Sequence, residues 1–421
     1  MRLKGDNASR VAVRGYSAQV YAGVLVAAFA GMAEARSLGS RGYGVLAVVV
    51  AAYPFGVILL GLGVPVSLLR SVSQDPGKAV LALGVARRLA ARGLVVALPA
   101  SAAATWWLLR GYPVSTRSIA AIAITSSALG VFAEVGVQIL VSTNRLRQLG
   151  TMRLAPIAAV GGAVLIAWLA GVLSLNLAIG LVILKPLIET VLVLRYIGHP
   201  QRSKNRLRPH ISYGRRALAG QLGELGSARL DQLMLIPLIG SQVLGRYAVA
   251  VTISTLPLTV VHARLAQRYG SMARTSDQAL GPILRWLFSS VLLTVGLGLP
   301  ISVLAGQLLP VLYGPDFAGL LPTLLVLVIA TALVTGAYSL GTVLSALGRP
   351  VYSSIGWLLG LVATVALMPY MARGSGILGV AWLSCLSYAI TILSMIGGVT
   401  RVVRRSGAQA LVPLPSVSID S

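Results

Sequence analysis

The stretch that decides the fold is residues 219–247, AGQLGELGSARLDQLMLIPLIGSQVLGRY, which begins near the midpoint of the chain. Its hydrophobicity is typical of a membrane-spanning helix, yet it carries Glu224, Arg229 and Asp231. A charged side chain costs about 2.5 to 3.5 kcal/mol at the bilayer centre on insertion scales, so these charges predict a functional surface. Three glycines at a spacing of three favour close approach of another helix or local unwinding: Gly220, Gly223 and Gly226.

The composition around this stretch is that of a membrane protein. The 421 residues are 56% hydrophobic and 11% charged, whereas soluble domains are about 25% charged. A helix needs roughly 20 apolar residues to cross a bilayer. We therefore predict an all-α membrane protein of about 12 transmembrane helices, over residues 15–35, 44–69, 93–109, 118–142, 154–173, 175–195, 217–239, 247–266, 284–305, 320–346, 351–371 and 377–398.

The net charge of +25 is distributed asymmetrically about these spans. Of the 35 Lys and Arg residues, 27 fall in segments on one side, which places both termini in the cytoplasm by the positive-inside rule. The basic loops lack the interleaved aromatic residues typical of nucleic-acid binding, so no nucleic-acid partner is expected. Anionic membrane lipids are the expected partners of these loops.

The predicted spans divide into two halves of six. We expect an N-terminal bundle over 1–200, a basic cytoplasmic linker over 201–216, a C-terminal bundle over 217–400 and a cytoplasmic tail over 401–421. An offset of 203 places Gly42 on Gly245 and Pro54 on Pro257, which suggests parallel structural repeats. The short loops leave no room for a soluble catalytic domain, so any function is expected inside the membrane.

The polar side chains of residues 217–239 gather on one side of the expected helix. At about 100° per residue, four of them fall within about a third of its circumference: Gln221, Glu224, Asp231 and Gln232. Arg229 lies at the edge of this face. On an ideal helix Arg229 and Asp231 point too far apart to pair, so Arg229 requires a partner on another helix or an anionic ligand.

Three further charges lie within predicted spans. Lys185 and Glu189 are one helical turn apart, which favours a structural ion pair. Glu134 has no partner in its own span, and two alternatives remain open for it, a proton site or a salt bridge to Arg229. The six intramembrane charges sum to −2, which suggests coupling to a proton or sodium. The spacing of the three histidines and the single Cys385 predict no metal site, and no cofactor is expected.

Several motifs, in this order and spacing, resemble those of the polysaccharide biosynthesis proteins. These are the Wzx-type oligosaccharide flippases of the multidrug/oligosaccharidyl-lipid/polysaccharide exporter superfamily, and the resemblance covers nearly the whole chain. The motifs are Arg36-Ser-Leu-Gly-Ser-Arg-Gly-Tyr-Gly, Arg229-Leu-Asp-Gln, Leu244-Gly-Arg-Tyr-Ala-Val-Ala, Leu309-Pro-Val-Leu-Tyr-Gly-Pro-Asp-Phe and Leu344-Ser-Ala-Leu-Gly-Arg-Pro.

This resemblance implies two six-helix bundles around a central cavity in the bacterial cytoplasmic membrane. It implies a flippase that moves an undecaprenyl-pyrophosphate-linked oligosaccharide across the membrane by alternating access, for surface polysaccharide synthesis. A glycan polymerase and other glycan assembly proteins are its implied partners. Arg229 would hold phosphate, and Asp231, Glu224 or Glu134 would serve coupling or sugar hydroxyls. Cavities of the family are often cationic, whereas the one expected here is mixed in sign.

Two other functions are weighed against this one. A cation-coupled drug or metabolite exporter of the same superfamily usually has an acidic residue deep in its first span, whereas Glu34 lies near the outer end of this one. A polyprenyl-dependent membrane glycosyltransferase would have paired carboxylates in a large outer loop, and the outer loops here are short. The sequence therefore predicts a transporter and not an enzyme.

Overall fold

The computed structural model describes residues 2–201, 207–258, 261, 280–346 and 349–410, and it contains no strand in these ranges. The prediction of an all-α fold is confirmed. The α-helices are α1 (Arg2–Gly61), α2 (Val64–Gln74), α3 (Ala79–Leu108), α4 (Val114–Thr125), α5 (Ser127–Ser142), α6 (Leu146–Leu169), α7 (Leu175–Leu181), α8 (Leu184–Tyr196), α9 (Leu207–Ile239), α10 (Ser241–Ser254), α12 (Leu280–Leu312), α13 (Leu321–Ala346) and α14 (Pro350–Ala410). Two short 3-10 helices are η1 (Pro76–Lys78) and η2 (Pro315–Phe317).

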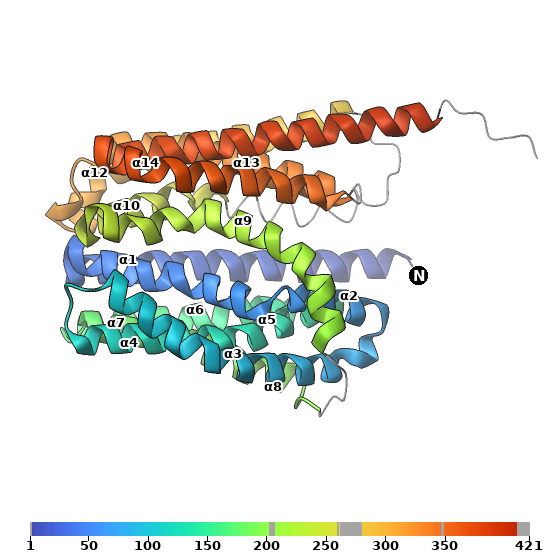
Figure 1. The fold of residues 1–421 in the computed structure, drawn as a ribbon, viewed down its shortest axis with the longest axis horizontal. Helices are drawn as coiled ribbons and strands as arrows, with labels where there is room; N and C mark the ends of the chain where they lie inside the picture. Colours follow the sequence, from blue (N-terminus) through green and yellow to red (C-terminus); the bar gives the residue numbers. More distant parts are fainter. Residues whose placement is uncertain (1, 202–206, 259–260, 262–279, 347–348, 411–421) are drawn as a thin grey trace, which may run out of the picture.

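Seven stretches of the described chain are helical, long and apolar enough to cross a membrane. The two longest, 44 residues in α1 and 52 in α14, contain glycines outside helical geometry, Gly39 at φ 63° and Gly376 at φ 55°. Glycine adopts positive φ without the steric penalty of a Cβ, so the chain can reverse there. In Figure 1 both α1 and α14 run out and return, with their reversals at the same end of the molecule. Each predicted span lies at least partly on a helix, and the count of twelve stays a prediction.

The helices form two groups that lie side by side in Figure 1, with α1 to α8 in one and α9 to α14 in the other. Helices α1 and α2 of the first group pack against α9 and α10 of the second. Helix α9 begins at Leu207, so the second part of the predicted linker 201–216 is helical, and residues 202–206 lie outside the described chain. Helix α14 continues through residues 401–410 of the predicted tail, whose last residues, 411–421, are also outside it.

Helices α1 and α10 touch through their backbones. A Cβ built on Gly44 of α1 would lie 1.9 Å from the carbonyl oxygen of Ser241, and one built on Gly245 of α10 would lie 1.9 Å from that of Ser40. The contact is reciprocal, because Gly44 meets Ser241, the first residue of α10, and Gly245 meets Ser40, which follows the reversal of α1 at Gly39. Only glycine fits such an approach, so these two positions fix how closely the two groups pack.

This reciprocal contact gives the register of the internal repeat. Gly39–Ser40 and Gly240–Ser241 each combine a positive-φ glycine with the serine that opens a helix, and Gly44 and Gly245 follow at the same distance. The offset is therefore 201, and the offset of 203, which paired Gly42 with Gly245, is wrong by two residues. Alanine and valine are so frequent here that short matches arise in several registers, whereas the turn geometry allows one.

Helices α1 and α14 both reverse at the same end of the molecule, which we call the hairpin end. At this end, residues of each group of helices form hydrogen bonds with the turn of the other group. Asp316 of η2 accepts hydrogen bonds from the Ser40 backbone N–H (3.1 Å) and hydroxyl (2.9 Å). The Tyr112 hydroxyl, between α3 and α4, lies 2.7 Å from the Ser241 hydroxyl. The Arg36 guanidinium donates to the carbonyl oxygen of Val311 at 2.8 Å. These contacts tie the two groups together at the hairpin end.

The glycines of α9 face α14 and confirm the predicted close approach, with α9 remaining helical across them. A Cβ added at Gly220 would lie 2.4 Å from the Ser354 hydroxyl, and one at Gly226 would lie 2.6 Å from Leu361. The Ser227 hydroxyl donates to the Trp357 carbonyl oxygen at 3.2 Å. Because this side of α9 is committed to residues 354–361 of α14, the polar face of α9 is directed away from that segment.

Candidate functional site: two cavities that share Arg229

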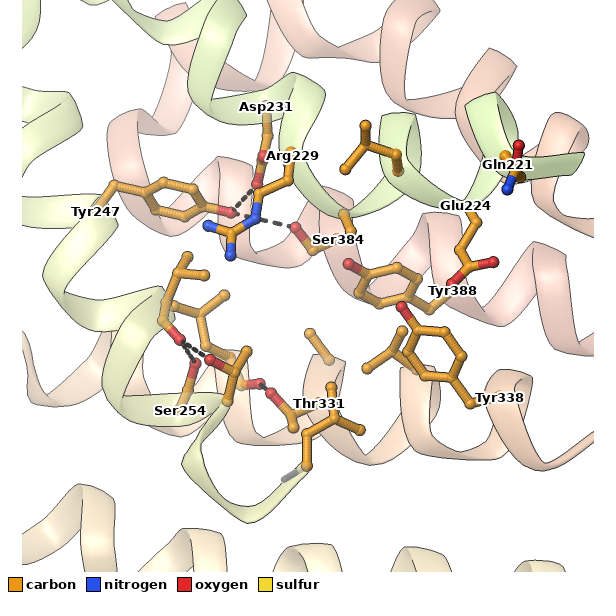
Figure 2. A pocket seen from close by; sticks show the side chains of 18 of the residues that line it. Gln221, Glu224, Arg229, Asp231, Tyr247, Ser254, Thr331, Tyr338, Ser384 and Tyr388 are labelled. Atoms are coloured by element: carbon orange, nitrogen blue, oxygen red, sulfur yellow. Dashed lines mark hydrogen bonds between the residues drawn. The ribbon is translucent and has the colours of Figure 1, made fainter. Parts of the chain in front are cut away.

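A cavity of about 490 Å³ lies among α9, α10, α13 and α14, and we call it the C-cavity. Figure 2 shows its polar side chains converging on one space. Four of the five residues predicted to bind substrate line it, namely Gln221, Glu224, Arg229 and Asp231. The structure adds side chains that the sequence reasoning missed, of which the main ones are Tyr247, Ser254, Thr331, Tyr338, Ser384 and Tyr388.

A second cavity, of about 600 Å³, lies mainly within the first group of helices, and we call it the N-cavity. It contains the three residues predicted to serve coupling or to line a cavity, Glu134, Lys185 and Glu189. Its other charged lining residues are Glu34, Arg153 and Arg229. The charges that the sequence placed in separate spans are therefore gathered in two cavities, one for each group of helices.

Arg229 lines both cavities and also a third, smaller one of about 140 Å³ beside α1 and α10. Gln232, the fifth predicted substrate-binding residue, lines this small cavity and not the C-cavity. The Arg229 side chain is exposed within this space, and its Nη1 donates to the Gln232 amide oxygen at 3.4 Å. It is therefore a cation at the junction of the two halves of the protein.

Arg229 has no acidic partner in the described part of the chain, where the one ion pair within 4.0 Å joins Lys78 to Asp75 on the surface. The prediction that Asp231 cannot pair with it is confirmed. Of the two alternatives for Glu134, the salt bridge to Arg229 is contradicted, because Glu134 instead accepts a hydrogen bond from the Gln138 amide at 2.7 Å. A guanidinium with no carboxylate partner is suited to bind an anionic ligand.

Asp231 is held by the protein itself. The Tyr247 hydroxyl of α10 donates to one carboxylate oxygen at 2.6 Å, and the Gln232 backbone N–H donates to the other at 2.7 Å. Asp231 is 6% exposed and Tyr247 is 0% exposed. A buried acceptor whose two oxygens are both engaged chiefly stabilises the position of its partners, so Asp231 fixes Tyr247 and through it α10 against α9.

Glu224 faces two tyrosines on the opposite wall of the C-cavity (Figure 2). The Tyr338 hydroxyl of α13 hydrogen-bonds its carboxylate. The Tyr388 hydroxyl of α14 donates to the Ser227 carbonyl oxygen at 3.2 Å. Tyrosines in apolar spans were the sequence signal for this wall, because a phenol in the membrane requires a hydrogen-bonding partner.

The predicted ion pair between Lys185 and Glu189 is wrong. The two side chains do not come within 4.0 Å of each other, and the Lys185 ammonium instead lies 5.5 Å from the centre of the Tyr53 ring. Lys185 is in the first turn of α8, and its ammonium faces the aromatic ring of Tyr53 of α1 instead of the carboxylate one turn further along. Both side chains line the N-cavity.

Metal binding has no support in the described residues, which contain no group of three or more His, Cys, Asp or Glu side chains placed to hold an ion. Cys385 is buried, and its thiol lies 3.5 Å from the Val326 carbonyl oxygen. The chemistry that the cavities offer is therefore binding by the guanidinium groups of Arg153 and Arg229, the ammonium of Lys185, hydroxyl groups, aromatic rings and carboxylates.

Comparison with solved structures shows a transporter fold. The chain is similar to the lipid II flippase MurJ in its inward closed conformation, with 13% identity, a TM-score of 0.71, and 91% of this chain and 87% of that chain covered. It is also similar to a multidrug resistance MATE family transporter of the MOP superfamily in its inward-facing conformation, with 14% identity, a TM-score of 0.67, and 90% and 96% covered.

A third similar structure is a MOP superfamily transporter from Pyrococcus furiosus, described as having a binding pocket of reverse polarity. It is 16% identical with a TM-score of 0.55, and 95% of this chain and 96% of that chain are covered. No protein with a curated description matches the chain. At these identities the likeness establishes the fold alone, which this chain shares with membrane transporters.

The family is established by sequence. The family model of the polysaccharide biosynthesis proteins matches residues 35–322, which is more than half of the chain and includes parts of both halves and Arg229. This chain is therefore a multi-pass membrane protein that belongs to the polysaccharide biosynthesis protein family.

Proposed function

We propose that this protein is a flippase that moves a polyprenyl-pyrophosphate-linked oligosaccharide across the bacterial cytoplasmic membrane by alternating access, for the synthesis of a surface polysaccharide. The observation that carries the proposal is the position of Arg229, exposed where the N-cavity and the C-cavity meet. A planar guanidinium binds phosphate oxygens in a bidentate manner, and here it has no competing carboxylate within 4.0 Å in the described chain.

The remainder of the C-cavity suits a carbohydrate. Glu224 and Gln221 offer polar atoms to sugar hydroxyls, and tyrosine side chains offer apolar ring faces with a polar tip. Asp231 and Gln232 contribute by fixing Tyr247 and Arg229. The membrane lipid itself supplies the surroundings of the polyprenyl tail, and a glycan polymerase and other glycan assembly proteins would receive the translocated product.

The N-cavity supports coupling of transport to protons or sodium. Three carboxylates line it, Glu34, Glu134 and Glu189, and none has a Lys or Arg nitrogen within 4.0 Å among the described residues. A carboxylate in a membrane cavity is costly as a bare anion, so binding of a proton or a cation is favourable. Uptake or release of that ion as the two groups of helices rearrange would link transport to an ion gradient.

One observation favours a second candidate, a cation-coupled exporter of drugs or metabolites. Glu34, although it lies near the reversal of α1, lines the N-cavity and the small cavity next to Arg229. An acidic residue of the first span that reaches the central cavities is what an exporter of cationic compounds would use. This function predicts that deletion of the gene changes drug resistance and leaves surface polysaccharide intact.

The experiment is complementation of a strain from which the gene of this protein is deleted, with surface glycan and lipid-linked oligosaccharide both measured. Arg229→Ala should abolish surface glycan and cause lipid-linked oligosaccharide to accumulate, and Arg229→Lys should restore part of the function. Arg373→Ala is the matched control, because Arg373 is an exposed arginine near the reversal of α14. Normal surface glycan with Arg229→Ala, at wild-type protein levels in the membrane, would refute the proposed role.

A further inference from the structure

The tyrosine wall of the C-cavity is a rigid aromatic surface. Tyr338 and Tyr388 come from different helices, and Trp357 of α14 packs against both, with ring centres 5.3 Å and 6.5 Å away. Trp357 is 3% exposed and lies behind the two tyrosines, which line the cavity. The Tyr388 hydroxyl is also tied to the backbone of α9 at Ser227. A platform held in this way loses little conformational freedom when a ring-shaped ligand stacks on it.

The C-cavity beside the platform formed by Tyr338 and Tyr388 contains more carboxylates than cations. Arg229 is the one cation among the described residues that line the C-cavity, and the carboxylates there are Glu224 and Asp231. Asp231 is engaged by Tyr247 and by the backbone of Gln232, whereas Glu224 faces the cavity next to the platform (Figure 2). If Arg229 holds a phosphate group, a ligand ring on the platform has a carboxylate as its charged neighbour and no second cation.

The N-cavity contains more cations than the C-cavity does. Two cations, Arg153 and Lys185, line it in addition to Arg229. An acidic sugar would therefore find positive charge in the N-cavity but not on the platform. Like charges close together in a site of low dielectric repel strongly, and such repulsion is a common source of specificity.

The geometry points to a sugar-binding subsite on Tyr338 and Tyr388 that accepts neutral sugars and amino sugars and rejects sugars that carry a carboxylate, with Glu224 as the residue that discriminates. This inference rests on the proposed function and deepens it, because it assigns the charge class of the sugar next to the pyrophosphate. Glu224 would accept hydrogen bonds from ring hydroxyls or from an ammonium group, and it would repel a uronic acid.

The test uses four probes that share one lipid and differ only in the sugar. They are farnesyl pyrophosphate and its glucosyl, glucosaminyl and glucuronyl derivatives, whose binding to the full-length protein in lipid nanodiscs is measured by thermophoresis. Stacking and hydrogen bonding should make the glucosyl and glucosaminyl probes bind about tenfold more tightly than farnesyl pyrophosphate. The glucuronyl probe should bind no more tightly than farnesyl pyrophosphate.

Two variants connect this preference to the platform. Glu224→Gln should let the glucuronyl probe bind as tightly as the glucosyl probe. Tyr388→Leu should remove the gain in affinity that the sugar gives the glucosyl and glucosaminyl probes. Asp75→Asn, which changes a surface carboxylate outside both cavities, should leave the order of the four affinities unchanged.

Each contrary outcome has its own meaning. Glucuronyl and glucosyl probes that bind wild-type protein equally would overturn the inference and leave the proposed flippase function standing. Retention of the preference in Glu224→Gln would remove Glu224 as its cause and equally overturn the assignment. If farnesyl pyrophosphate and all its derivatives fail to bind, the proposed function itself fails.

Discussion

Gly44 and Gly245 lie in reciprocal contact where α1 crosses α10, with Gly44 against Ser241 of α10 and Gly245 against Ser40 of α1. No side chain separates the two backbones at this point. The pair is related by the 201-residue repeat, so one contact joins equivalent positions of the two halves. Because the crossing lies near the hairpin end, it sets the distance between the two groups of helices there.

Alanine at either position should destabilise the protein. The added Cβ would lie 1.9 Å from a carbonyl oxygen of the opposite helix, so the helices must separate. Overpacking of this kind costs about 1 to 3 kcal/mol. Thermal unfolding of Gly44→Ala and Gly245→Ala in detergent should show a lowered Tm, whereas Gly296→Ala in α12, where no atom lies within 4 Å, should not. Equal Tm values for all three variants would contradict the contact.

The contact between Asp316 and Ser40 should make the stability of the hairpin end depend on pH. Hydrogen bonds from the Ser40 backbone and hydroxyl, with a smaller contribution from the charge of Arg246, lower the pKa of Asp316 from its ordinary value of 3.8. A lowered pKa in the folded state means that the ionised carboxylate stabilises the fold at pH values above the ordinary pKa. This stabilisation is lost as the pH falls through the folded-state pKa.

Wild type and Asp316→Ala should therefore differ in thermal stability at neutral pH, and the difference should shrink as the pH falls below 3.8, the ordinary pKa of the group. Unfolding midpoints of both proteins across an acid titration give the comparison. A difference that stayed constant into the acid range would mean that the Asp316 carboxylate does not stabilise this contact through its charge.

Removal of the Tyr247 hydroxyl should destabilise the protein more than removal of an exposed one. Tyr247→Phe leaves one oxygen of the buried Asp231 carboxylate without its 2.6 Å donor. A buried polar group left unsatisfied costs about 1 to 3 kcal/mol. Tyr370→Phe, at a tyrosine that is 77% exposed, is the matched control and should unfold like wild type. Equal unfolding of the two variants would show that the Asp231 contact adds no stability.

The asymmetry of basic residues predicts that both termini are cytoplasmic. In Figure 1 the N-terminus and the end of α14 lie at the end opposite the hairpin end. A reporter fused after Arg405 should read cytoplasmic, and one inserted at Gly374, near the reversal of α14, should read periplasmic. A periplasmic reading at Arg405 would reverse the orientation and place the hairpin end in the cytoplasm.

Transport by the protein in vesicles should respond to an ion gradient. If, as proposed, the N-cavity carboxylates bind a proton or sodium in one conformation and release it in the other, a pH or sodium gradient should change the rate of transport of a lipid-linked oligosaccharide. Measurements with each gradient imposed alone would identify the ion. Complete indifference to both gradients would remove coupling through these carboxylates.

Hydrophobicity and helical periodicity predicted much of this structure, because both depend on residues close in the sequence. The apolar runs located the helices, and the polar face with Glu224 and Arg229 was directed at a cavity as expected. Contacts between distant residues could not be predicted in this way. Spacing alone paired Lys185 with Glu189, but the packing of the helices brought the Lys185 ammonium to the ring of Tyr53, a residue distant in the sequence.

The tyrosines of the C-cavity were missed for the same reason. Tyr247, Tyr338 and Tyr388 lie on three helices that are distant in sequence. In the sequence each of them is a single polar residue in an apolar span. Their convergence depends on the packing of α9 against α14, which the glycines permit but do not specify. The register of the repeat likewise required the geometry of the turn at Gly240.

Arg229 lines both large cavities, and this has a consequence for the barrier to transport. A pyrophosphate that moved between two separate cation sites would have to cross an apolar gap with its charge unbalanced, which is the slowest step that such a path could contain. With one guanidinium reachable from either side, the anion can change cavities while it keeps the same partner. In the proposed flippase a single residue would then hold the anion in both cavities, and the number of charges that the membrane interior must hold would be kept small.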